Sequence, residues 1–166
     1  STGCSWGDYD NDMDLDLFVT SASNSNNLLF QNNGGGSFTQ IATGDIVTDG
    51  GDSHGSAWGD IDNDGFIDLF VANDREGAGF LYLNNGDGSF TKVTNDPTTT
   101  ANGNSMAAAF SDMDRDGDLD LLIANHSNES NFYFTNNGNS NNWLQVRLTG
   151  TNSNKSAIGA RVKVKA

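Results

Sequence analysis

The sequence predicts an all-β protein built from tandem repeats, and three observations support this prediction. Residues typical of turns dominate the 166-residue chain, which has 20 Gly and only one Pro, and 20 of its 22 acidic residues are Asp. Its apolar residues fall in short runs that lack a helical period. Finally, blocks of sequence recur at a fixed spacing of 52 residues. The 16 aromatic residues, at regular positions along the chain, argue against disorder.

The repeat has the same register in three copies. Its two clearest blocks lie at residues 5–8, 57–60 and 109–112, and at residues 32–34, 84–86 and 136–138. We therefore divide the chain into repeat 1 (1–52), repeat 2 (53–104), repeat 3 (105–142) and a C-terminal segment (143–166).

Each repeat is expected to form about four short strands. One surrounds Trp6, Trp58 or Phe110, whose rings we expect to pack between repeats. The others are the apolar runs at 15–20, 68–72 and 119–124, at 28–30, 80–83 and 132–134, and at 38–41 and 90–94. Four strands in roughly 50 residues match the size of a propeller blade, so we predict three tandem four-stranded, propeller-type blades. Because a ring usually needs four to eight blades, the array is open, or other chains or further residues complete it.

Acidic residues cluster in one nine-residue loop of each repeat, at 8–16, 60–68 and 112–120. Positions 1, 3, 5 and 9 are Asp in all three loops. Four neighbouring carboxylates repel one another, and a hard divalent cation removes that repulsion. Ca²⁺ binds six to eight oxygens in flexible geometry, which suits these loops better than Mg²⁺ or zinc chemistry. Position 7 varies in type, so we expect its backbone carbonyl to be the ligand.

Two other interpretations of the loops were weighed. An EF-hand needs Glu at position 12, where this chain has Val19, Val71 or Ile123 inside an apolar run. Asp-Asn-Asp-Gly is also ordinary turn chemistry, although three copies in one register favour a site. Gly65 and Gly117 at position 6 permit a left-handed turn, but loop one has Met13 there, so we expect its site to be the weakest.

These blocks resemble a known family. Trp-Gly-Asp-x-Asp-Asn-Asp-Gly at 58–65 and Leu-Asn-Asn-Gly-Asp-Gly-Ser-Phe at 83–90 are similar to FG-GAP/VCBS repeats, the blades of calcium-binding β-propellers such as the integrin α-subunit head. Residues 142–148 and 157–162 resemble the start of the ASPIC/UnbV segment. The resemblance implies Ca²⁺ ligands at positions 1, 3, 5, 7 and 9 of the three loops. These residues are Asp8, Asp10, Asp12, Asp14 and Asp16; Asp60, Asp62, Asp64, Phe66 and Asp68; and Asp112, Asp114, Asp116, Asp118 and Asp120.

The charge distribution bears on partners. A net charge of −14 makes nucleic-acid binding improbable, and no apolar run is long enough to insert in a membrane. The segment 143–166 has five basic and no acidic residues, so we expect it either to complete the third blade or to pair with a neighbouring chain.

Weak calcium sites fill outside cells, so the sequence predicts an extracellular or cell-surface protein. The expected function is a structural or adhesive scaffold that binds protein, glycan or copies of itself. The alternative is a carbohydrate-binding module or an accessory domain of a secreted enzyme, with Trp143 as a possible sugar-stacking ring. No catalytic constellation is evident in the spacing of the residues, so we do not expect an enzyme.

Overall fold

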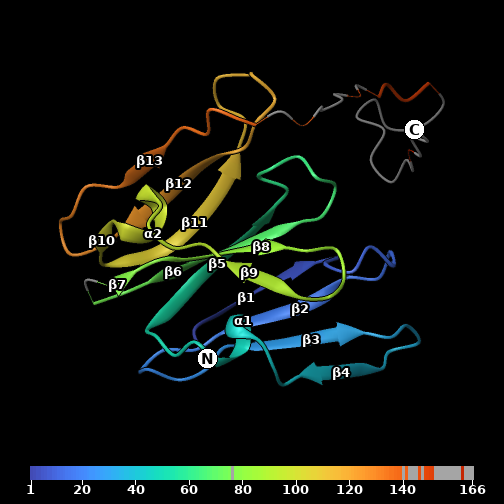
Figure 1. The fold of residues 1–166 in the computed structure, drawn as a ribbon, viewed down its shortest axis with the longest axis horizontal. Coiled ribbons are helices and arrows are strands. Elements are labelled where there is room, and N and C mark those ends of the chain that lie inside the picture. The colour runs from blue at the N-terminus through green and yellow to red at the C-terminus, as the bar shows by residue number, and fades with distance from the viewer. Residues whose placement is uncertain (76, 140, 142–145, 147, 152–161, 163–166) are drawn as a thin grey trace.

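The computed structural model describes residues 1–75, 77–139, 141, 146, 148–151 and 162. It confirms an all-β protein, in which antiparallel sheets follow one another along the chain (Figure 1). The only helices in the described part are the single turns α1 (Asp45–Thr48) and α2 (Pro97–Thr100). No described helix has the length and apolar character needed to cross a bilayer.

The first two repeats each form one four-stranded antiparallel sheet, as expected. Sheet 1 has the order β1-β2-β3-β4 and sheet 2 the order β5-β6-β8-β9. Their strands are β1 (Gly3–Gly7), β2 (Asp16–Thr20), β3 (Leu28–Asn32), β4 (Phe38–Ile41), β5 (Ser53–Gly59), β6 (Asp68–Asn73), β8 (Phe80–Asn84) and β9 (Phe90–Lys92).

The third repeat differs from this expectation. Among the described residues, sheet 3 has only three strands, β11 (Ser105–Ser111), β12 (Asp120–Asn125) and β13 (Phe132–Phe134). A small ladder between β7 (Gly77–Ala78) and β10 (Asn102–Gly103) lies within repeat 2, directly before repeat 3. Most of the predicted C-terminal β segment (143–166), including Trp143 and all five of its basic residues, lies outside the described residues.

The sheets stack face to face in chain order, with β5 in contact with both β1 and β11 (Figure 1). Because side chains alternate along a strand, β6 supplies apolar residues to two cores. Leu69 and Val71 join the core between sheets 1 and 2, whereas Phe70 and Ala72 join the core between sheets 2 and 3. All of β6 is buried, which explains its continuous apolar sequence.

The aromatic residue of each first strand was expected between sheets, and this is confirmed at two of three positions. Trp58 packs edge-on against Phe18 with ring centroids 6.2 Å apart, and Phe110 packs on the core between sheets 2 and 3. The expectation is wrong for Trp6, which is 52% exposed. No other described sheet covers this face of sheet 1, and the Trp6 ring packs against Phe38 of its own sheet.

Candidate metal centre

Each acidic loop joins the first and second strands of its sheet. Loop one runs from β1 to β2, loop two from β5 to β6 and loop three from β11 to β12. The strand pairing closes each loop as a hairpin, since Gly7 pairs with Asp16 and Gly59 with Asp68. The loops therefore sit at equivalent corners of three stacked sheets, and none has the flanking helices of an EF-hand.

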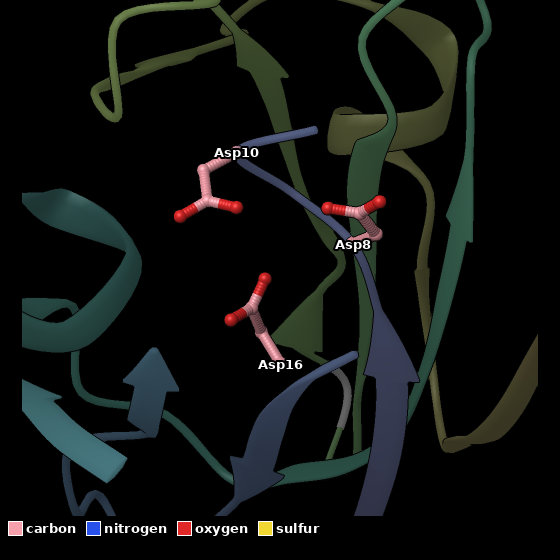
Figure 2. Close-up of side chains that lie close together, drawn as sticks. All are labelled: Asp8, Asp10 and Asp16. Atoms are coloured by element: carbon pink, nitrogen blue, oxygen red, sulfur yellow. The ribbon is translucent and has the colours of Figure 1, made fainter. Parts of the chain in front are cut away.

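The carboxylates of each loop converge. In loops one and two, the Asp residues at positions 1, 3 and 9 bring one oxygen each within 4.8 Å of the others. In loop three, positions 1, 3 and 5 do so. Figure 2 shows the arrangement in loop one, where Asp8, Asp10 and Asp16 face a shared space from the end of β1 and the start of β2. The converging sets are Asp8, Asp10 and Asp16; Asp60, Asp62 and Asp68; and Asp112, Asp114 and Asp116.

The position 9 carboxylate holds the loop to its sheet. Both oxygens of buried Asp68 accept hydrogen bonds from backbone amides, Oδ2 from Ile61 and Oδ1 from Asn84, each at 2.9 Å. Asp16 and Asp120 repeat this pattern. Position 9 thus ties the start of the loop to the end of the third strand, and in loops one and two it also brings an oxygen into the acidic cluster.

Positions 3 and 5 form local turns. In each loop their side-chain oxygens accept hydrogen bonds from the amide two residues later, as in Asp12 Oδ1 to the Asp14 amide at 2.8 Å. This is the turn chemistry considered as an alternative to metal binding.

Position 1 separates the two interpretations in loops one and three, whereas in loop two both oxygens of Asp60 accept hydrogen bonds from loop amides. The Oδ1 atoms of Asp8 and Asp112 are buried and have no hydrogen-bond partner among the described residues. A buried carboxylate oxygen without a partner is costly, and turn formation does not explain it. A bound cation would satisfy both atoms.

The backbone of the loops confirms the expected left-handed turn. Position 6 has a positive φ in all three loops, 94° at Gly65, 99° at Gly117 and 80° at Met13. A residue with a Cβ is strained in this conformation by about 1–2 kcal/mol. Position 4 is also left-handed, at Asn11, Asn63 and Arg115, which the sequence analysis missed. Asn at two of these positions was the available signal, because Asn tolerates this conformation.

Burial and mutual repulsion raise the pKa values of several loop carboxyls. Burial raises the pKa of Asp68 to about 7, and the charges of Asp62 and Asp64 add to the effect against the two amide hydrogen bonds. Burial likewise raises the pKa values of Asp16 and Asp62. Without a cation, Asp16, Asp62 and Asp68 therefore hold protons more tightly than ordinary carboxyls do, because their pKa values are raised.

Asp120 is the exception at position 9. Burial acts to raise its pKa, but hydrogen bonds from the Asn136 and Met113 amides and from the Tyr133 hydroxyl lower it overall. The Tyr133 hydroxyl lies 3.0 Å from Asp120 Oδ2, and the equivalent residues in the first two sheets, Leu29 and Leu81, lack such a donor.

No protein cation neutralises the loops in the described part of the chain. The four ion pairs found there use Asp49, Asp52 and Asp74, all outside the loops. The loops contain neither His nor Cys, so their donors are oxygens throughout. A set of oxygen donors with unpartnered buried carboxylate atoms fits a hard divalent cation such as Ca²⁺.

Hydrogen bonds also link loops one and two to the next repeat. Asn84 Nδ2 donates to the Tyr9 carbonyl of loop one at 2.7 Å, and its equivalent Asn136 donates to the Ile61 carbonyl of loop two at 2.8 Å. Asn63 Nδ2 reaches Asp118 of loop three at 2.6 Å. The sequence analysis used the Asn-Asn-Gly blocks only to define the repeat and missed this role, although their repetition every 52 residues was a signal.

The predicted ligands at positions 5 and 7 are less clearly placed. Position 5 joins the converging set only in loop three. The side chain of Asp118 at position 7 accepts a hydrogen bond from Asn63, and Phe66, at position 7 of loop two, has no side-chain atom that could bind a metal ion. The prediction that the position 7 carbonyl binds the ion stays a prediction.

Stacked antiparallel sheets with an acidic hairpin loop in each repeat define an all-β repeat protein. The FG-GAP-like repeat matches residues 8–71 and again residues 60–123, two matches that start 52 residues apart at position 1 of loops one and two. The chain belongs to the FG-GAP-like repeat family, whose repeats fit a β-propeller-like fold. No match was found among curated proteins.

Proposed function

We propose that the protein is a calcium-stabilised extracellular scaffold whose repeats act as propeller-type blades and mediate protein association, including association with copies of itself. The observation that carries the calcium part is the pair of buried, unpartnered carboxylate oxygens on Asp8 and Asp112. The Asp residues at positions 1, 3, 5 and 9, with the position 7 carbonyl, would hold one Ca²⁺ in each loop. The ion would supply charge neutralisation, and the proposal includes no catalysis.

Ion binding in these loops would stabilise the stacking of sheets as well as each hairpin. Asn84 and Asn136 attach loops one and two to the following sheet, so an ordered loop favours the ordered interface. A ligand that binds only the folded state adds its binding free energy to folding. Calcium sites of extracellular modules have dissociation constants of roughly 10⁻⁴–10⁻³ M, which is why we place the protein outside the cell.

The association part rests on two end faces that no sheet of the described residues covers. Trp6 and Phe38 on the outer face of sheet 1 are 52% and 44% exposed. Leu122 on the outer face of sheet 3 is 42% exposed, whereas its equivalents Phe18 and Phe70 are fully buried by the next sheet. By analogy with the interfaces between sheets inside the chain, the outer face of sheet 1 in one copy would pack on the outer face of sheet 3 in another. Such head-to-tail contacts form rings or filaments.

Thermal unfolding and light scattering with and without Ca²⁺ test the two parts separately. For the calcium part, we expect chelation with EGTA to lower the melting temperature and Ca²⁺ to restore it better than Mg²⁺. For the association part, we expect Trp6→Ala to reduce self-association without changing the effect of Ca²⁺ on the melting temperature. A melting temperature indifferent to Ca²⁺ would reject the calcium part. A monomer at every protein concentration would reject self-association.

The carbohydrate-binding alternative remains a prediction. It depends on Trp143, which lies outside the described residues. Glycan-array binding that is lost in Trp143→Ala would support it over the scaffold. The resemblance of 142–162 to the ASPIC/UnbV segment also stays a prediction.

A further inference from the structure

A path of hydrogen bonds joins the acidic loops of the first two repeats. It starts at Asp68, position 9 of loop two, whose Oδ1 accepts from the backbone amide of Asn84 at 2.9 Å. The Nδ2 atom of Asn84 donates to the Tyr9 carbonyl at 2.7 Å. The Tyr9 backbone amide in turn donates to Oδ2 of Asp16, position 9 of loop one, at 3.1 Å. The path therefore connects one carboxylate of the converging set in loop one to one in loop two.

The path is shielded from water along its whole length. Asp16, Asp68, Asn84 and Tyr9 are all buried. Hydrogen bonds in such surroundings are stronger than in water, and a buried group that loses its partner bears the full cost of desolvation. Asp16 also faces the space shared by the loop one carboxylates (Figure 2). A change in the position of one of the two carboxylates therefore affects the other.

A second contact joins the same two loops on their exposed side. Asn11, position 4 of loop one, donates from Nδ2 to the carbonyl of Gly65, position 6 of loop two, at 3.1 Å. Both residues have a positive φ, 58° at Asn11 and 94° at Gly65. Because this contact needs both turns in place, an ordered turn in one loop favours an ordered turn in the other.

Loops two and three are linked less directly. The Asn136 backbone amide donates to Asp120 at 3.0 Å, and its Nδ2 atom donates to the Ile61 carbonyl at 2.8 Å. Asp120 is not in the converging set of loop three, however, and Asp116 is found there instead. We therefore expect the strongest coupling between loops one and two.

Two effects oppose each other when neighbouring loops both hold a cation. A cation in one loop holds its carboxylates in the converged arrangement, which keeps the shared hydrogen bonds in place for the other loop. The same cation also cancels negative charge that attracts the second one. Salt screens this electrostatic effect but acts much less on buried contacts, so ionic strength separates the two.

We propose that loops one and two bind their cations cooperatively, with Asn84 and Asn11 as the positioning residues that couple them. This inference rests on the proposed calcium sites and adds that two of them are not independent. Because coupling between binding sites is reciprocal, a cation in either loop raises the affinity of the other by the same factor. Factors of about 5 to 150 are typical of coupled sites, and we expect at least about 5 here.

Titration calorimetry with Ca²⁺ measures the factor in a full chain that retains only these two sites. Asp112→Asn with Asp114→Asn disables loop three and gives this two-site protein. We expect the second Ca²⁺ to bind at least about fivefold more tightly than independent sites would allow. The factor should persist when NaCl is raised from about 0.15 M to about 1 M, because salt screens the repulsion between the cations and not the buried path.

A link variant of the two-site protein removes both contacts between the loops. It combines Asn84→Ala with Asn11→Gly, since glycine retains the positive φ required at position 4. We expect its coupling factor to fall to about 1 or below, because only the repulsion between the cations remains.

A matched control variant changes the equivalent residues in the neighbouring repeat. Asn32→Ala removes a side chain that makes the same bonds within its own repeat as Asn84 does, to the Leu15 carbonyl and from the Gly34 amide. Asn63→Gly changes position 4 of loop two, whose side chain donates to Asp118 in the disabled loop three. We expect the control to keep the coupling factor of the two-site protein.

A second comparison leaves Asn84 and Asn11 unchanged, in case the link variant folds poorly. Asp60→Asn with Asp62→Asn, added to the two-site protein, leaves loop one as the single site. In about 1 M NaCl, where charge effects are screened, we expect this site to bind Ca²⁺ at least about fivefold more weakly than the second ion binds to the two-site protein.

The possible results distinguish this inference from the proposed function. Independent sites in the two-site protein, or equal coupling in the link and control variants, would overturn the cooperative link and leave the calcium sites in place. Equal affinities in the second comparison would do the same. No binding of Ca²⁺ to the two-site protein or to the unmodified chain would reject the calcium part of the proposed function, and the coupling with it.

Discussion

Asp68 makes the stability of the calcium-free protein depend on pH in a direction opposite to that of most carboxylates. Its carboxyl is fully buried, and burial raises its pKa to about 7. An unfolded chain has an Asp pKa of about 3.9, so the folded state binds the proton more tightly. This contribution to stability is complete below about pH 4 and is lost as the pH rises through about 7.

The size of the effect follows from the two pKa values. Three pKa units correspond to about 4 kcal/mol between the fully protonated and fully ionised limits. Between pH 5 and pH 8, the same two values give a loss of about 2–3 kcal/mol in the free energy of unfolding. Saturating Ca²⁺ should reverse the trend, because the ion would replace the proton.

Urea unfolding at pH 5 and pH 8, in metal-free buffer and in millimolar Ca²⁺, measures this effect. In Asp68→Asn, which cannot ionise, we expect most of the loss to disappear along with much of the stabilisation by Ca²⁺. Asp45→Asn removes an exposed charge at α1, outside the loops, and serves as the matched control. Equal pH dependence in Asp68→Asn and Asp45→Asn would refute the reasoning.

Two further predictions concern the loop backbone and the sheet interfaces. Met13→Gly should stabilise the protein by about 1 kcal/mol in urea unfolding, because position 6 requires a positive φ. Gly65→Met should destabilise it by a similar amount. If both variants had the same free energy of unfolding as the unmodified protein, the inference that Met13 is strained would be wrong. Trp58→Ala should cost about 3–5 kcal/mol because Trp58 packs against Phe18 in the core, whereas Trp6→Ala on the exposed face should change the free energy of unfolding of the monomer by less than about 1 kcal/mol. Similar losses in the two tryptophan variants would contradict the stacking order of the sheets.

Repetition made most of the fold predictable. Because Trp58 and Phe110 recur in register with the acidic loops, the four-strand pattern of the first two repeats followed from spacing alone. The exposure of Trp6 did not follow, because burial depends on the neighbouring sheet and not on the residue itself. Repeat 3 was harder still, since Gly-Ser-Phe of the first two repeats is replaced by Ser-Asn-Asn at 140–142.

The site was predictable in composition and less so in geometry. Asp at positions 1, 3 and 9 converges in two loops as expected. The buried oxygens of Asp8 and Asp112 could not be predicted, because burial depends on the packing of neighbouring residues in space. The repeated Asn-Asn-Gly blocks signalled a role for Asn84 and Asn136, but not their partners, which lie 75 residues away in the chain.

Equilibrium dialysis with labelled calcium at millimolar concentration tests most directly whether the loops hold cations. We expect three ions per chain, reduced to two when Asp60 and Asp62 are both changed to Asn. Calcium uptake near zero, or uptake that is unchanged in that double variant, would contradict the assignment of the loops as metal centres.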